Sequence, residues 1–434
     1  MSWIRSAPWD ALWIQSALWL APLAFLLARG HENPTQSPLD TLFFGLTALF
    51  WIGHRLGSAW LAYATTAYRP LLRADPVRFV FAPLVIALAC LAILLPADET
   101  LGFTRAERVV ALVLLDYVFV TYHFAAQHFG VLCLYRVRAG RAASVWTRRV
   151  DQLFALGVGG ALIVLAEAVG EMNIFQGEWL AWLDRSWLEA SAGGLRTGAA
   201  MLMAIACAAL ILQEARASKP SLPRVLYAAG VAGMVACALY TERPFLFVVM
   251  WTAQHWLVAT ALATRVACAE PAPRGSRLLE MLHAVNRRPW ALLLVLSLLS
   301  ALLLPVMEVE AASSDGVSYG ERLFGAFALA LRESDWLPAL IAVGFASGFL
   351  HYWLDRAAYR LSDPGVRTAA RGLLLHLEQL DIEDERRIGR NDAARAAAAV
   401  AHLGRDDERA LAAHFHAGDA LIPAPDHAAS AERK

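Results

Sequence analysis

The sequence predicts an all-α protein, a bundle of about ten helices that cross a membrane. Composition is the first reason, since 58% of the 434 residues are hydrophobic, only 18% are charged and the mean hydropathy is +0.46. An ordinary soluble domain is less apolar and more charged. The second reason is that mostly apolar runs of about 18 to 27 residues, the length that crosses a bilayer as a helix, recur along the chain. The third is an alternation of charge in the segments between these runs.

The predicted helices follow one another closely through the first 356 residues. Each apolar run is bounded by charged residues, proline or glycine, which favour its ends over its interior. The runs cover residues 11–28, 40–67, 78–96, 109–135, 151–170, 196–213, 222–240, 244–264, 289–307 and 336–356.

The connecting segments predict the orientation of the bundle. Arginine and lysine gather in every second connector, at Arg69, Arg73 and Arg78, at Arg136 through Arg149, at Arg216 through Arg224 and at Arg274 through Arg288. The alternate connectors are acidic, as at Asp98, Glu99, Glu178 and Asp315. Because basic connectors stay in the cytoplasm, we predict that both chain ends are cytoplasmic and that the protein lies in the inner (cytoplasmic) membrane.

Two regions are expected. Residues 1–361 form the transmembrane domain, and residues 362–434 form a cytoplasmic tail, because after Asp363 and Pro364 the composition shifts to alanine, arginine and acidic residues. The five cysteines have no paired or CxxC spacing, which argues against disulfides and against a thiolate metal site. The formal net charge of zero gives no overall basic field for nucleic acid, so the expected partners are the bilayer and an apolar small molecule.

Histidines inside the apolar runs are the strongest indication of function. An imidazole in hydrocarbon is costly unless it meets a partner, a cavity or a metal ion. The predicted metal ligands are His54, His123, His128, His255 and His351. All lie in helices predicted to run from outside to inside, about 5 to 15 residues before the first arginine of the cytoplasmic connector, so at ~1.5 Å per residue they share one band of depth.

The pair in the fourth helix leaves two possibilities open. His123 and His128 are five residues apart, which places them ~140° apart on a regular helix. They therefore share an ion only if the helix is distorted or the site lies between them, or they serve two neighbouring ions. We take His128 as a ligand together with His54, His255 and His351, and His123 as a fifth member. The segment from Ala126 to Phe129 is echoed from Ala253 to Trp256, which would make His128 and His255 equivalent.

Two acidic residues accompany the histidines. Asp355 follows His351 by one helical turn on the same face, so it can ligate the same ion or act as a catalytic base beside it; the alternative is that it pairs with Arg356 or Arg360. Asp116 shares a helix face with His123 but lies about 10 Å further along the axis, too far to ligate the same ion. Its expected role is packing, or a contact with the substrate path.

Imidazole and carboxylate ligands without cysteine suit iron, zinc, copper or manganese, and several histidines with one acid within reach of lipid suit ferrous iron and oxygen chemistry. We therefore expect a non-haem iron oxygenase with one ion, or two, acting on a lipid or isoprenoid. Two alternatives remain open. One is a haem-binding electron carrier with two axial histidines. The other is a proton- or ion-coupled transporter.

Short motifs resemble known membrane enzymes. The spacing of His123 and His128 is that of the first histidine box of membrane desaturases and hydroxylases, but the chain has no HxxHH box, which disfavours that family. A closer resemblance is to the Brp/Blh-type carotenoid-cleaving dioxygenases. It is carried by Gly53-His54, His123-Phe124, His128-Phe129-Gly130 and His351-Tyr352 with Asp355, and the predicted span count and the tail exceed that pattern. The resemblance implies a lipid-facing non-haem iron centre that uses dioxygen.

Overall fold

The computed structural model is a helical bundle. It describes residues 2–28, 38–97, 100, 102–142, 144–171, 186–240, 244–270, 276–307, 330–331 and 333–374, and within these ranges it contains helices and turns but no strand. The ten longest helices are α2 (Ala17–Ala28), α3 (Pro38–Ala64), α5 (Ala82–Leu94), α6 (Arg105–Arg138), α7 (Val145–Glu171), α8 (Ser186–Ala215), α9 (Leu222–Tyr240), α10 (Pro244–Cys268), α12 (Pro289–Met307) and α15 (Leu337–Ala358). Shorter helices are α1 (Ala7–Leu12), α4 (Arg69–Ala74), the π-helical turn η1 (Val77–Phe81), α11 (Arg277–Asn286), α16 (Pro364–Ala369) and the 3₁₀ turn η3 (Arg371–Leu373).

Each of the ten apolar runs overlaps one of these long helices, several of which extend beyond the run. Five stretches among the described residues are long and apolar enough to cross a membrane: Val77–Leu94, Arg105–Arg138, Gly193–Ala215, Leu222–Tyr240 and Leu337–Ala358. A sixth arises if α11 and the following Pro289–Leu303, bent by 108°, count together. The all-helical fold class is thus confirmed, while the count of ten spans and their orientation stay predictions.

Local sequence explains where the helices begin. Thr104 caps α6 through a capping box, in which its hydroxyl accepts from the Glu107 backbone N–H and the Glu107 carboxylate accepts from the Thr104 backbone N–H. Asp363 caps α16 in a similar way, and Pro364 occupies the first position of that helix, where its missing N–H costs nothing. These caps fix the entry points of the chain into the bundle.

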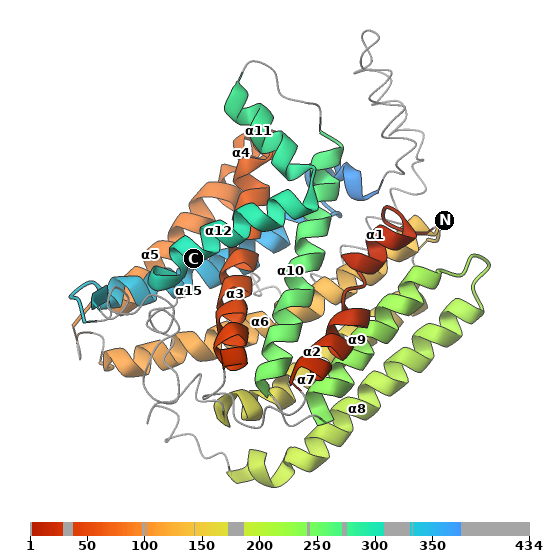
Figure 1. Cartoon of the computed structure of the whole chain (residues 1–434), viewed down its shortest axis with the longest axis horizontal. Coiled ribbons are helices and arrows are strands. Elements are labelled where there is room, and N and C mark those ends of the chain that lie inside the picture. Colours follow the sequence, from red (N-terminus) through yellow and green to blue (C-terminus); the bar gives the residue numbers. More distant parts are fainter. Residues whose placement is uncertain are drawn as a thin grey trace, which may run out of the picture.

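Helices α3 and α10 run through the middle of the bundle (Figure 1). Helix α3 packs against α10, α12 and α15, and α5 packs on the far side of α15. On the opposite side α7, α8 and α9 form a second group, joined to the rest by α6 and α2. Close contact of α3 and α10 depends on Gly53, since a Cβ there would lie 2.6 Å from the Trp256 ring. Small residues allow helix backbones to approach in this way.

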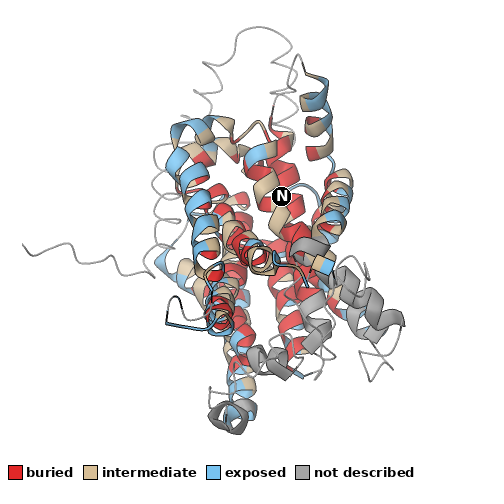
Figure 2. Ribbon diagram, turned by 90° about the vertical axis from the view of Figure 1, so that its left-hand side faces the viewer, coloured by how far each residue is buried: buried red, intermediate tan, exposed pale blue. Residues whose placement is uncertain are grey.

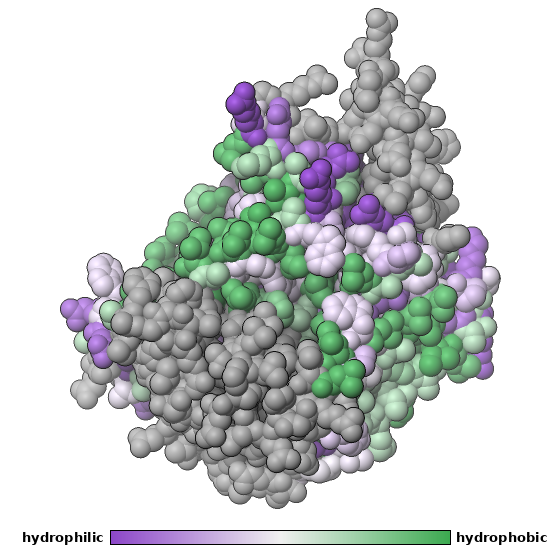
Figure 3. Space-filling view, in the orientation of Figure 1, coloured by the Kyte–Doolittle hydropathy of each residue, from purple (hydrophilic) through white to green (hydrophobic). Residues whose placement is uncertain are grey.

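The surface of the bundle is apolar. Buried residues gather where helices meet, and exposed residues follow the outward faces (Figure 2). Those outward faces carry large hydrophobic side chains such as Val85, Val118, Met201 and Leu302, which are 63%, 64%, 58% and 75% exposed. On the face drawn in Figure 3, hydrophobic side chains occupy much of the described surface, and the most polar ones gather at its margins. Such an outer surface is typical of helices that face lipid.

A buried network of ions joins α6, α7, α8 and α9 at the arginine-rich end of α6. The Arg136 guanidinium lies 2.6 Å from the Asp151 carboxylate, and both side chains are fully buried. Arg224 bridges Asp151 and Glu214, and Arg141 pairs with Glu214 as well. Removing one partner from such a network leaves a charge buried without compensation, so these residues fix how the four helices meet.

The first residues of the predicted tail pack against the bundle. Val366, Ala370 and Leu373 are buried in the same hydrophobic core as the long helices. At Gly372 the chain passes so close to α10 that a Cβ would lie 2.0 Å from the Arg265 carbonyl oxygen. Residues 375–434 lie outside the described residues, so the boundary predicted at residue 362 stays a prediction.

Candidate metal centre

Four helices each bring one histidine to a common point in the interior. The ring nitrogens of His54 (α3), His123 (α6), His255 (α10) and His351 (α15) can be chosen so that all lie within 4.8 Å of one another. All four side chains are buried, at 7% exposure or less. Helices of the same predicted direction have thus brought together residues of similar predicted depth.

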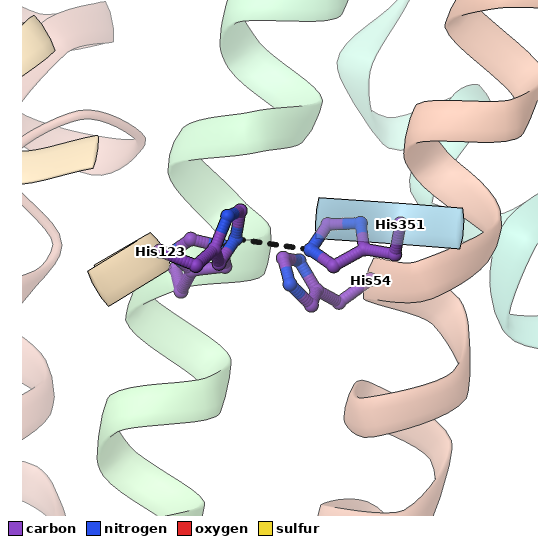
Figure 4. A group of neighbouring side chains, drawn as sticks. His54, His123 and His351 are labelled. Carbon is purple, nitrogen blue, oxygen red and sulfur yellow. Dashed lines mark hydrogen bonds between the residues drawn. The ribbon is translucent and has the colours of Figure 1, made fainter. Parts of the chain in front are cut away.

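The rings face one another closely. His123 Nε2 lies 2.8 Å from His255 Nε2 and 3.0 Å from His351 Nε2, the latter contact drawn as the dashed line in Figure 4. The His54 ring centroid is 4.0 Å from that of His255 and 3.8 Å from that of His351. A neutral imidazole has one N–H and one lone pair, so hydrogen bonds alone satisfy only part of this arrangement.

A metal cation between the four imidazole rings would satisfy their nitrogens better than hydrogen bonds between the rings do. Metal–imidazole bonds are about 2.0–2.1 Å long, so two nitrogens at right angles about one ion stand roughly 3.0 Å apart and two opposite nitrogens roughly 4.2 Å apart. The Nε2 separations of 2.8 and 3.0 Å match nitrogens at right angles, and the limit of 4.8 Å for the whole group exceeds the largest separation by about 0.6 Å, so small side-chain movements would complete the set. The buried cluster of four histidines can therefore hold a metal ion.

Asp355 lies beside the four histidines. Its Oδ2 is 3.6 Å from His123 Nε2 and 4.0 Å from His351 Nε2, while its Oδ1 accepts a 2.5 Å hydrogen bond from the Ser58 hydroxyl. At these distances the carboxylate is next to the ring nitrogens without replacing any of them. The arrangement fits an orienting or proton-accepting role, and a small movement of the side chain would bring Oδ2 to an ion.

His128 is not brought into the group. Its Nδ1 is 2.7 Å from the Tyr227 hydroxyl of α9, and its ring lies against Trp251 with the centroids 5.7 Å apart. The reason is helical geometry: α6 runs without a break through both residues, so His123 and His128 point about 140° apart. The structure therefore has His123 inside the group and His128 outside it. The sequence had favoured His128 as a ligand, with His123 as a fifth member.

Asp116 lies in a separate polar contact. Its Oδ1 and the Arg55 Nε are 3.1 and 3.8 Å from the position that a Cβ at Gly348 would occupy. Arg55 itself donates to the Gly344 carbonyl and to the Ser347 hydroxyl of α15, at 3.3 and 3.0 Å. Asp116 is not among the grouped ligands, in agreement with its expected distance from the ion.

A long cavity reaches the histidines from the apolar surface. It has a volume of about 790 Å³ and lies between α5, α6 and α15, with His123, Asp355 and Tyr352 in its wall. Two of its lining residues, Val85 and Tyr122, are 63% and 42% exposed, so the cavity is accessible from the outer face of the bundle. We call it the α5–α6 groove.

Two neighbours of the site were missed from the sequence. Ser58 bridges His351 and Asp355, and the Tyr352 ring stands 5.1 Å from the His123 ring. Ser58 could have been found, because it follows His54 by one turn and so shares its helix face. Tyr352 adjoins His351 in sequence, but an aromatic residue in an apolar helix is ordinarily a packing residue.

Comparison with known proteins adds no relative: no protein-family model, curated protein or solved structure matches this chain.

Proposed function

We propose that this protein is a membrane-embedded, non-haem iron oxygenase that acts on a long apolar substrate. The observation that carries the proposal is the convergence of four buried histidines, one of which, His123, lies in the wall of a groove that opens on the apolar outer face. His54, His123, His255 and His351 would hold the ion. Ferrous iron bound there would activate dioxygen for reaction with the double bonds of an apolar substrate.

The number of histidines favours a non-haem iron ion over a haem group. In a bis-histidine haem protein two imidazoles take the axial positions and the macrocycle fills the plane between them. Here four imidazoles from four helices approach one point within 4.8 Å, and the additional rings occupy the space that a macrocycle needs. The haem alternative and the transporter alternative remain as outcomes of the experiment below.

The shape of the groove supports a linear substrate. Its wall includes both Leu112 and Leu134, which are roughly 33 Å apart on a straight helix, and His123 lies midway between them. A cavity of about 790 Å³ that follows this length of α6 has room for a long hydrocarbon chain. An isoprenoid chain, as the resemblance to carotenoid-cleaving dioxygenases implies, fits this description.

The side chains of the groove suggest two separate roles, binding of the substrate and transfer of a proton. Phe119, Phe349 and the apolar face of α5 would bind the chain and exclude water. Asp355 would accept or hold a proton close to His123, because its Oδ2 is 3.6 Å from Nε2. Such a dry, shaped cavity also protects a reactive centre from side reactions.

The experiment that tests the function combines metal analysis with isotope labelling. We expect detergent-purified protein to contain iron, with an optical spectrum free of haem bands, and to consume dioxygen when given a carotenoid but not a saturated alkane of equal length. With ¹⁸O₂, a dioxygenase places both oxygen atoms in the products and needs no external reductant, whereas a monooxygenase places one and requires two electrons. A haem spectrum, or metal-bound protein without oxygen uptake on any polyene or lipid, would reject the proposal.

The proposed topology has ten spans with both chain ends in the cytoplasm. Reporter fusions after Arg141 and Arg274 should then report the cytoplasm, and fusions at Glu178 and Ser314 the outside, because arginine-rich connectors are retained inside. An exterior signal after Arg141 would reverse the direction of α6 and reject this topology.

A further inference from the structure

Ser58 stands between the histidine cluster and Asp355. It lies on α3, one turn beyond His54, and is 4% exposed. Its Oγ is 2.6 Å from His351 Nδ1 and 2.5 Å from Asp355 Oδ1. Both distances are those of good hydrogen bonds, so one hydroxyl joins a candidate ligand to the neighbouring carboxylate.

When Asp355 is ionised, counting protons determines the direction of both bonds. An ionised carboxylate only accepts, so the single hydroxyl proton of Ser58 is donated to Asp355. The second contact of the hydroxyl oxygen must then be filled by a donor, which is the N–H of His351 Nδ1. The lone pair of His351 is consequently on Nε2, the nitrogen that stands 3.0 Å from His123 Nε2.

We propose that Ser58 is a positioning residue that holds His351 in the Nδ1–H tautomer and connects it to the charge of Asp355, so that Nε2 is available to the metal. The metal half of this inference rests on the proposed function. A histidine ligand commonly donates its other N–H to a carboxylate or carbonyl, which orients the ring and raises its basicity. Here the serine hydroxyl lies between the two groups, and α3 supplies both a ligand and the residue that orients another.

Reversing the direction of both hydrogen bonds would give the opposite tautomer of His351. If Ser58 donated to His351 Nδ1, then Asp355 would have to be protonated to donate to Ser58, and His351 would carry its proton on Nε2. In that state Nε2 has no lone pair for an ion. The two arrangements therefore differ in an observable, the tautomer of a single histidine.

The first test uses the wild-type chain without metal. Protein labelled with ¹⁵N-histidine should give the Nδ1–H pattern of nitrogen shifts for His351, assigned by its loss in His351→Gln. An Nε2–H pattern for this residue overturns the proposal whether or not the protein binds iron. Iron content of the wild type is measured separately and tests the proposed function alone.

The second test measures metal affinity by competition with a chelator. Ser58→Ala should weaken the affinity about 10- to 100-fold, the usual effect of losing a partner that orients a ligand. Ser58→Thr and Ser58→Val form a matched pair of nearly equal shape, and only the threonine variant should approach the wild-type affinity. Ser300→Ala is the control, because this buried serine of α12 donates to the Leu296 carbonyl of its own helix and is not part of the histidine group.

The threonine and valine variants add the same bulk, so a difference between their metal affinities is not explained by a loss of folding. Equal metal affinity of the threonine and valine variants, with the wild type binding metal, would overturn the proposal. A tenfold or larger advantage of threonine, accompanied by retention of the Nδ1–H tautomer only in that variant, is the expected result.

Discussion

His123→Ala should abolish stoichiometric metal binding, whereas His128→Ala, five residues further along the same helix, should leave the metal content unchanged. His123 Nε2 is within 3.0 Å of two other ring nitrogens, while His128 is bonded to Tyr227 instead. Loss of a ligand should weaken binding by more than the roughly 10- to 100-fold that follows from loss of an orienting partner. The measurement is metal per protein by mass spectrometry after dialysis against a weak chelator.

His128→Ala has its own expected cost. It leaves the Tyr227 hydroxyl buried without its partner, which should reduce stability by about 1–3 kcal/mol. A thermal unfolding curve separates this effect from metal loss. If instead the two alanine variants lost metal equally, or His128→Ala alone did, the assignment of His123 to the centre would be wrong.

Gly372→Ala should be the most damaging small substitution outside the centre. Its Cβ would lie 2.0 Å from the Arg265 carbonyl oxygen and 2.9 Å from the carbonyl carbon, both backbone atoms that cannot rotate away. Overpacking of this kind costs typically 1–3 kcal/mol and sometimes more. We expect a lower unfolding temperature, with segment 364–374 released from α10 and more readily cut by protease.

The control for this substitution is Gly233→Ala on α9, where a Cβ would meet nothing within 4 Å. Alanine in place of glycine inside a helix is favourable by up to about 1 kcal/mol, so this variant should be as stable as the wild type or more so. Equal unfolding temperatures for the two variants would mean that the segment after Asp363 does not dock as described.

The sequence predicted the helices and the convergence of histidines for the same physical reason. Apolar runs must form helices in lipid, and charge at their ends sets the depth of each residue within them. His54, His255 and His351 therefore could be placed in one layer before any contact was known. The rotation of each helix about its axis could not be predicted, which is why the sequence favoured His128 over His123 whereas the structure has His123 in the group.

Other parts of the site depended on contacts between helices. The spacing of Ser58 from His54 places it on the same helix face but does not reveal its partners, since serine in an apolar helix usually bonds to the carbonyl four residues earlier, as Ser300 does. Its role appears only when α15 brings His351 and Asp355 to α3. Similarly, Leu373 reads as part of a polar tail, and its burial depends on the close approach of Gly372 to α10.

We infer that four histidines bind one metal ion inside the bundle. X-ray absorption at the iron edge of the purified, iron-loaded protein tests it most directly, because the fine structure counts imidazole neighbours and their distance. We predict about four imidazole nitrogens at about 2.0–2.2 Å, without the signature of a porphyrin, and a lower imidazole count in any His123→Ala protein that retains iron. A first shell of oxygen atoms alone, a porphyrin pattern, or an unchanged imidazole count in His123→Ala would contradict it.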